Sequence, residues 1–321
     1  MTRTVQAVVP GSTSNLGPGF DLFGLALDLY LRLKVTVEGR FVMATAADVA
    51  WEVVWSGEGE GLPAPIPLDE DNLAVRGLRR VWETAGVGVE GRVRVEARSE
   101  IPVSRGLGSS ASAFVAGLLA GEALAEADLG KERLLALAAA EEGHPDNAAP
   151  ALFGGLTAAA PLPGGDHILT HRGLLFEKYL LGVSIPDRTL NTKLAREALP
   201  ATIPHREAVA SQQRAFFLFQ CLTEGCTWSL RELVRDTLHQ PHRAPLIPAF
   251  DEVMARAYEC GAHAVWLSGS GPTLCWLVEG TLEQVEDIGT AVALRWRDEG
   301  ITAETRVLAP DNWGGAVHEV D

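Results

Sequence analysis

Cysteine and lysine are scarce in this chain of 321 residues. The four cysteines, at positions 221, 226, 260 and 275, show no C-x-x-C spacing, so we expect free thiols in a reducing compartment and no disulfide bonds. Lysine occurs only at positions 34, 131, 178 and 193, and the sequence contains no G-x-x-x-x-G-K-[ST] motif. A phosphate loop of that type is therefore excluded.

Long apolar segments and an excess of basic residues are also lacking. No run of 18 or more apolar residues occurs, and the most apolar helical stretch contains Glu122 and Glu126, so no membrane-spanning helix is expected. The first residues lead directly into a strand-like run, with no visible signal peptide. The net charge of −15 argues against nucleic acid or an anionic membrane as the main partner. These absences predict a soluble cytoplasmic protein.

The chain does contain enough apolar residues, 47%, for one large core or two ordinary ones. Residue patterns predict strands at 27–37, 50–56, 92–98 and 178–185, helices at 72–84, 111–127, 131–141 and 282–298, further helices between 192 and 259, and a hairpin around 268–272. The sequence Pro-Leu-Pro-Gly-Gly at residues 161–165 is a candidate connector. We therefore expect an N-terminal domain of residues 1–160 and a C-terminal domain of residues 161–321.

A short Gly- and Ser-rich turn is the most informative feature of the sequence. It follows an alternating strand pattern and precedes an uninterrupted helical run at residues 111–127. Gly106 and Gly108 would let the backbone approach an anion closely, and the nearby serines add hydroxyl groups. Free amide groups and the positive end of a helix at such a turn are suited to phosphate. The turn therefore predicts a nucleotide site.

Two other structures would also place glycine and serine at this point. One is an ordinary helix N-cap, because serine before an alanine-rich helix is typical of that position. The other is a dinucleotide site, since Gly106, Gly108 and Ala111 fit G-x-G-x-x-[GA]. That site requires a second strand with an acidic residue about 20 positions later. Here two helical segments follow instead, so dinucleotide binding is not expected.

The complete string at residues 102–112, P-x-x-x-G-L-G-S-S-A-S, resembles the second motif of the GHMP small-molecule kinases. Residues 9–21, VPGSTSNLGPGFD, resemble the first motif of that superfamily, and residues 266–273, WLSGSGPT, resemble the third. The three motifs stand in the expected order along the chain.

Within this superfamily the chain is most similar to the homoserine kinases. Residues 12–27 resemble their first motif, with Ser14 where alanine is frequent, and residues 144–155 resemble their H-P-D-N-x-A-P-A-x-x-G-G signature. Residues 191–200 and 242–248 resemble two further segments, each of which contains an arginine. The resemblance spans about residues 5–280. It implies an α+β fold of two domains, an N-terminal one with a left-handed βαβ crossover and a ferredoxin-like C-terminal one, with the active site in the cleft.

The resemblance implies transfer of the ATP γ-phosphoryl group to the side-chain hydroxyl of L-homoserine, a step of threonine biosynthesis. The nucleotide would contact the second motif, whose residues are Pro102, Val103, Ser104, Arg105, Gly106, Leu107, Gly108, Ser109, Ser110, Ala111 and Ser112. Residues 268–271 would support this loop. Mg²⁺ keeps most of its waters and needs few protein oxygens. By resemblance these come from Ser110 and from a glutamate just before His144, where Glu142 fits better than Glu141.

An amino-acid substrate must be held at its ammonium and its carboxylate. The resemblance assigns Asp21 to the ammonium and Arg196 and Arg243 to the carboxylate, for which a bidentate guanidinium is well suited. Arg188 and Arg206 are weaker candidates for the carboxylate. Three neutral side chains would place the reacting hydroxyl: Asn15, His144 and Asn147.

The general base is the open point of this prediction. Asp146 could accept the hydroxyl proton, orient His144 or hold its loop, and we favour an orienting or structural role. Two alternative functions remain. Another GHMP kinase, acting on a mevalonate derivative or a sugar, would not need the H-P-D-N sequence together with two arginines. A non-catalytic metabolite-binding relative would not need the loop serines or the metal-binding glutamate. The resemblance also implies a homodimer.

Overall fold

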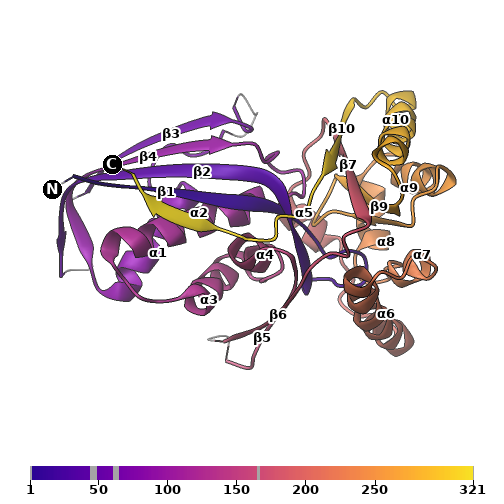
Figure 1. Cartoon of the computed structure of the whole chain (residues 1–321), viewed down its shortest axis with the longest axis horizontal. Coiled ribbons are helices and arrows are strands. Elements are labelled where there is room, and N and C mark those ends of the chain that lie inside the picture. The colour runs from indigo at the N-terminus through magenta and orange to yellow at the C-terminus, as the bar shows by residue number, and fades with distance from the viewer. Residues whose placement is uncertain (1, 44–48, 61–64, 165–166, 321) are drawn as a thin grey trace.

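The computed structural model describes residues 2–43, 49–60, 65–164 and 167–320, which form two lobes side by side (Figure 1). The first lobe contains β1 (Thr2–Ser14), β2 (Phe23–Val42), β3 (Val49–Gly57), α1 (Leu73–Ala85), β4 (Gly88–Ser99), α2 (Ser109–Ala125), α3 (Lys131–Glu142), α4 (Ala148–Phe153), β5 (Leu156–Pro161), β6 (Ile168–Gly173) and β11 (Ala316–Glu319). Within the described ranges, no helix has both the length and the apolar character needed to cross a membrane.

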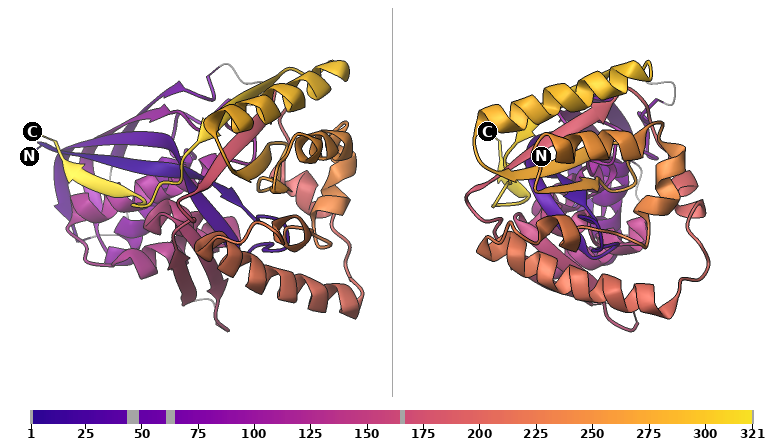
Figure 2. Two further views of the ribbon diagram at one scale, coloured as in Figure 1. Left: turned by 45° about the vertical axis from the view of Figure 1, so that its right-hand side comes forward. Right: turned by 90° about the vertical axis from the view of Figure 1, so that its right-hand side faces the viewer.

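The second lobe is formed by the rest of the chain. It contains β7 (Tyr179–Pro186), α5 (Thr192–Glu197), α6 (His205–Glu224), α7 (Leu230–Leu233), α8 (Gln240–Arg243), a 3₁₀ turn (Ala244–Leu246), α9 (Phe250–Glu259), β8 (Ala264–Leu267), β9 (Leu274–Glu279), α10 (Leu282–Asp298) and β10 (Ala303–Leu308). Figure 2 shows α6 and α10 on opposite sides of this lobe.

The first lobe is a mixed sheet covered on one face by helices (Figure 1). Its strand order is β11-β1-β2-β4-β3, with β5 and β6 added at the cleft end of β2. Among the described strands, only β3 and β4 pair in parallel, and α1 connects them, which gives the β-α-β unit to which the expected left-handed crossover applies. The handedness itself stays a prediction.

Helix α2 passes through the centre of the first lobe, where it packs closely against α1. A Cβ atom at Gly117 would lie 2.0 Å from the carbonyl oxygen of Ala74, and one at Gly77 would lie 2.3 Å from that of Phe114. Glycine therefore allows the two backbones to approach each other. Because α2 is buried along most of its length, its N-terminus is held firmly at the cleft.

The second lobe has an antiparallel sheet in the order β10-β7-β9-β8. In chain order its strands are thus arranged 4-1-3-2, with helices between the first and second and between the third and fourth, which is the ferredoxin-like arrangement that we expected. Its core joins Trp276 of the sheet to Ile288, Val292 and Trp296 of α10.

The structure agrees with most of the predicted elements, and α10 has the predicted bounds. Sequence patterns missed α4, β5, β6, β10 and β11. The predicted connector at residues 161–165 begins at the end of β5 and lies between two paired strands of the first sheet, and its last residue is outside the described part. The C-terminal strand β11 also returns to the first lobe, where Val5 pairs with Glu319. The boundary at residue 160 stays a prediction.

Candidate active site

A cavity of about 520 Å³ lies between the two lobes. The first lobe contributes the loop between β1 and β2, the loop between β4 and α2, and the turn after α3. The second lobe contributes α5, Arg243 of α8, and the turn between β8 and β9. Residues from all the motifs of the sequence therefore meet in one place.

The loop between β4 and α2 has the conformation that a phosphate site requires. Gly106 and Gly108 have φ values of 79° and 75°. A Cβ atom would lie 2.2 Å from the carbonyl oxygen of Ser268 at Gly106, and 2.3 Å from Oγ of Ser12 at Gly108. No side chain caps α2, which argues against an ordinary serine N-cap. Residues 109–111, at the start of α2, line the cavity, and no hydrogen bond from their amide groups occurs within the described part of the chain, so these groups are available to an anion.

The first and third motifs hold this loop through its backbone. The amide of Ser12 donates to the carbonyl of Leu107 at 3.0 Å, and the hydroxyl of Ser268 donates to the carbonyl of Gly106 at 2.6 Å. The Ser268 hydroxyl oxygen also lies at hydrogen-bond distance, 2.9 Å, from Oγ1 of Thr13. The turn of the third motif therefore supports the phosphate loop, as expected.

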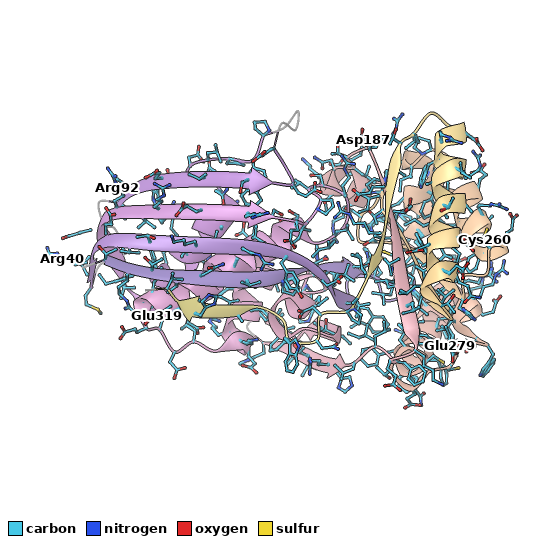
Figure 3. All side chains as sticks on the ribbon, turned by 45° about the horizontal axis from the view of Figure 1, so that its top comes forward. Arg40, Arg92, Asp187, Cys260, Glu279 and Glu319 are labelled. Carbon is cyan, nitrogen blue, oxygen red and sulfur yellow. The ribbon has the colours of Figure 1, made fainter. Side chains whose placement is uncertain are left out.

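Nine of the eleven predicted nucleotide residues line the cavity, and Arg105 and Ser112 do not. The guanidinium of Arg105 turns away to the carbonyl of Pro186 and to Asp187, which lies at the surface of the second lobe (Figure 3). The hydroxyl of Ser112 donates to the carbonyl of Pro10 at 2.8 Å. The side chains of these two residues thus stabilise the loop region, and a nucleotide contact of either one stays a prediction.

The two candidate glutamates at the end of α3 have different surroundings. Glu141 forms an ion pair with Arg76 and lies 3.9 Å from Arg80. Glu142 accepts a hydrogen bond from Ser110 instead. Burial raises the pKa of Glu142, although this hydrogen bond acts in the opposite direction. Among the described residues no arginine or lysine forms an ion pair with Glu142. Its carboxylate and the Ser110 hydroxyl are hard oxygen donors that fit Mg²⁺.

At the other end of the cavity Asp21 and Arg196 bind each other. Both terminal nitrogens of Arg196 donate to the carboxylate of Asp21, each at 3.0 Å. Asp21 has a φ of 55°, and its amide donates to Oδ1 of Asn15 at 3.0 Å. The amide group of Asn15 in turn donates to the carbonyl of Gly269 at 3.0 Å. Asn15 therefore fixes Asp21 against the turn of the third motif.

Arg243 is buried and is held by the protein backbone. Its Nε donates to the carbonyl of Ala195 at 3.2 Å and its Nη1 to that of Gly269 at 2.9 Å. The ring of Phe20 lies 5.3 Å from the guanidinium of Arg243 and 5.8 Å from that of Arg196. The two guanidinium groups thus lie near the same aromatic ring. The weaker candidates Arg188 and Arg206 are not among the cavity-lining residues.

The His144–Asp146 pair lies between the phosphate loop and this charged end. Nδ1 of His144 is 2.5 Å from Oδ1 of Asp146, which is buried. Burial disfavours both charged forms, but the contact with Asp146 raises the pKa of His144, and hydrogen bonds to His144 and Ser14 lower the pKa of Asp146. One oxygen or nitrogen atom from each of Asp21, His144 and Asp146 lies within 4.8 Å of the others. The pair thus directs an imidazole toward the acceptor end.

The side-chain amide of Asn147 forms hydrogen bonds with other side chains of the protein. Its Nδ2 donates to Oγ of Ser14 at 3.1 Å and to Oδ1 of Asp146 at 3.2 Å, and its Oδ1 accepts from Ser12 at 2.9 Å. The side chain therefore ties the H-P-D-N segment to the first motif. Direct contact between Asn147 and a substrate hydroxyl stays a prediction.

Sequence reasoning missed several residues that line the cavity and two aromatic rings beside Arg243. At the end beyond the phosphate loop the missed residues are Trp55, Ile66, Pro67, Asn72 and Leu73. They come from separate segments, and only Asn72 could have been noticed, because its side chain caps α1 through a 2.9 Å bond from the amide of Ala74. The two rings beside Arg243 belong to Phe20, which lies inside the first motif, and to His239, four positions before Arg243; neither residue is part of the cavity lining.

Comparison with known families agrees with both lobes. Residues 72–155 match the GHMP kinases N terminal domain, and residues 218–293 match the GHMP kinases C terminal domain. The crystal structure of homoserine kinase from Cytophaga hutchinsonii superposes with a TM-score of 0.84 at 26% identity and covers 98% of each chain. Mevalonate diphosphate decarboxylase from Enterococcus faecalis has a TM-score of 0.67 at 14% identity, which shows a shared fold alone.

Curated relatives cover nearly the whole chain. The homoserine kinase of Moorella thermoacetica is 38% identical over 309 residues, which are 96% of this chain and 98% of that protein. The homoserine kinase of Desulfitobacterium hafniense is 34% identical over 98% of this chain and 99% of its own length. The fold expected from the motifs is thus confirmed, and the chain belongs to the homoserine kinases, within the GHMP kinase superfamily.

Proposed function

We propose that this protein transfers the γ-phosphoryl group of ATP to the side-chain hydroxyl of L-homoserine, which forms O-phospho-L-homoserine and ADP. The main support for the proposal is that one cavity contains two different kinds of binding site. A glycine loop with a helix N-terminus lies at one end, and a carboxylate with two guanidinium groups lies at the other. The first suits a phosphate chain, and the second suits the two charges of an amino acid.

The nucleotide would lie along the phosphate loop. Amide groups of residues 106–110 would contact its phosphates, and the base would occupy the end lined by Trp55, Ile66 and Leu73. Ser110 and Glu142 would hold Mg²⁺, which supplies neutralising charge to the phosphate oxygens. Glu142 is suited to this role because Arg76 already neutralises its neighbour Glu141.

The acceptor would place its ammonium at Asp21 and its carboxylate between Arg196 and Arg243. Its hydroxyl would then extend toward His144 and the phosphate loop. Asp146 is a weak candidate for the general base, because its pKa is lowered and it is buried against His144. We therefore assign it an orienting role. Alignment of the hydroxyl and stabilisation of phosphate charge would account for most of the rate, and the proton would pass to the phosphate.

The test is an ADP-release assay with Mg-ATP and five alcohols: L-homoserine, D-homoserine, L-serine, mevalonate and galactose. We expect turnover with L-homoserine far above the others. Preference for another alcohol would overturn the acceptor assignment and favour a different GHMP kinase. ATP binding without turnover of any alcohol would favour a metabolite-binding protein.

We also propose a homodimer formed through α6. This helix exposes Phe216 and Phe217 to 69% and 53%, between Arg206 near one end and Glu224 at the other. Two copies packed antiparallel would bury the phenylalanines and bring Arg206 near the partner's Glu224. Light scattering should give twice the mass of one chain, and Phe216→Arg should give a single-chain mass. A wild-type monomer would contradict the proposal.

A further inference from the structure

The charged side chains assigned to the substrate differ in how many of their hydrogen-bonding atoms already bind other groups of the protein. Both terminal nitrogens of Arg196 and both oxygens of Asp21 are engaged in one ion pair. Arg243 uses Nε and Nη1 for backbone carbonyls, and no hydrogen bond from its Nη2 is present among the described residues. A carboxylate could therefore approach Arg243 freely, whereas it must compete with Asp21 for Arg196.

The ion pair also connects two parts of the molecule. Asp21 lies in the loop between β1 and β2, and Arg196 lies 175 positions later in the last turn of α5. Each partner is separately positioned. Asn15 binds the amide of Asp21, and Phe20 lies against the guanidinium of Arg196. Both groups would thus remain in the cavity after the pair has separated.

We propose that the Asp21–Arg196 ion pair selects zwitterionic acceptors, because only such a molecule replaces both partners at once. The inference rests on the proposed function. The substrate ammonium would replace Arg196 at Asp21, and the substrate carboxylate would replace Asp21 at Arg196, so one ion pair is exchanged for two.

In this scheme an alcohol with a single charge binds less favourably than a zwitterion. An alcohol that carries only a carboxylate can reach Arg243, but it gains Arg196 only by displacing Asp21, which leaves the aspartate without a partner. An alcohol that carries only an ammonium leaves the arginine without one. An unpaired charge in a partly buried site is unfavourable. The side chains of Arg196 and Asp21 are 41% and 32% exposed, so water reduces the penalty without removing it.

The experiment compares L-homoserine with two analogues that each lack one charge. These are 4-hydroxybutyrate, without the ammonium, and 3-aminopropan-1-ol, without the carboxylate. For each compound, kcat/KM is measured by ADP release and affinity by titration calorimetry, with the wild type, Asp21→Asn and Arg196→Gln. The double variant and Arg188→Gln, which changes an exposed arginine outside the cavity lining, are the controls.

Each single variant should bind and phosphorylate a different one of the two analogues better than the wild type does. Asp21→Asn removes the competitor for Arg196, so 4-hydroxybutyrate should bind and react about tenfold better than with the wild type. Arg196→Gln frees Asp21, so 3-aminopropan-1-ol should gain by a similar factor. L-Homoserine should lose about a hundredfold with either variant. The double variant should show neither gain, and Arg188→Gln should match the wild type.

If Asp21 and Arg196 contribute independently to ligand binding, the variants should give a different result. If 4-hydroxybutyrate with Asp21→Asn and 3-aminopropan-1-ol with Arg196→Gln stay at or below their wild-type values, the ion pair does not compete with the ligand and the inference is wrong. Failure of the proposed function would appear separately, as no ADP release from L-homoserine with the wild type. The calorimetric affinities would still decide the inference in that case.

Discussion

The two ends of the cavity bind charge in different ways. At the phosphate end the protein offers backbone amide groups, and the loop that carries them is fixed by hydrogen bonds from Ser12 and Ser268. At the acceptor end it offers ionised side chains from three segments, and Asp21 and Arg196 neutralise each other. Backbone amides suit the phosphate chain that every kinase of this superfamily must bind. The charged groups of a substrate can replace the partners of ionised side chains, so we expect substrate selectivity to reside at the acceptor end.

Removal of the carboxylate that we propose binds Mg²⁺ should have the largest effect. We expect Glu142→Ala to lower kcat by about a thousandfold, because phosphate charge would no longer be stabilised through Mg²⁺. Glu141→Ala, which loses a partly exposed pair with Arg76, should retain nearly full activity. Mg²⁺-dependent ATP binding measured by calorimetry checks both variants. The reverse pattern would assign the metal to Glu141.

A change that displaces the backbone of the phosphate loop should have the next largest effect on activity. In Gly106→Ala the new Cβ would lie 2.2 Å from the carbonyl oxygen of Ser268, so the loop must shift. A displacement of about 1 Å lowers activity roughly a hundredfold. Gly86→Ala is the matched control, because its φ of 70° is also positive but no atom lies within 4 Å of the new Cβ. It should cost about 1 kcal/mol of stability and leave ATP kinetics unchanged.

Truncation of an arginine at the acceptor end should affect the KM values for the two substrates differently. Arg243→Ala should raise the KM for L-homoserine about thirtyfold and leave the KM for ATP nearly unchanged, because the guanidinium lies beside Phe20, at the end that we assign to the acceptor. Arg188→Ala, on the exposed surface, serves as the control. Steady-state kinetics with each substrate varied in turn provide the measurement. Equal changes in both KM values would show that the ends of the cavity are not independent.

A smaller effect is expected at the carboxylate between the two ends. Asp146→Asn keeps the shape of the side chain and should lower kcat by less than about tenfold if Asp146 only orients His144. Pre-steady-state measurement of the phosphoryl-transfer step checks this. A loss beyond about a thousandfold would identify Asp146 as the general base.

The smallest effects concern stability and pH. Burial, aided by the charge of Arg243, lowers the pKa of His239 below its ordinary value near 6.5, so the unfolded chain binds the proton first and stability falls as pH drops below that value. The pKa of His144 is raised, so its contribution is present below about 6.5 and is lost as pH rises through its folded value.

Two glutamine variants test these opposite signs by urea unfolding between pH 5.5 and 7.5. His239→Gln should reduce the loss of stability at low pH by at most about 1.4 kcal/mol per pH unit. His144→Gln should increase that loss, because the variant no longer gains stability from the protonated imidazole. Parallel curves for the wild type and both variants would contradict the two pKa shifts.

Contiguous residues by themselves determined the phosphate end of the site. The glycines at 106 and 108 and the following helix all come from one short segment, and the structure has the predicted turn there, although the helix begins at Ser109 and not at residue 111. Local hydrogen bonds and φ preferences are encoded within a few residues, so sequence patterns predict them well. The same reason explains why the bounds of α10 agree with the prediction, since a Thr281 capping box begins this amphipathic helix.

Only the tertiary structure decided which side chains meet. The motifs predicted that Asp21 and Arg196 both serve the acceptor, but not that they bind each other across 175 positions. They also gave no indication that Trp55 and Ile66 line the cavity, or that β11 returns to pair with β1. The reason is physical: a turn is specified by its own residues, whereas the partner of a side chain depends on where the whole chain packs.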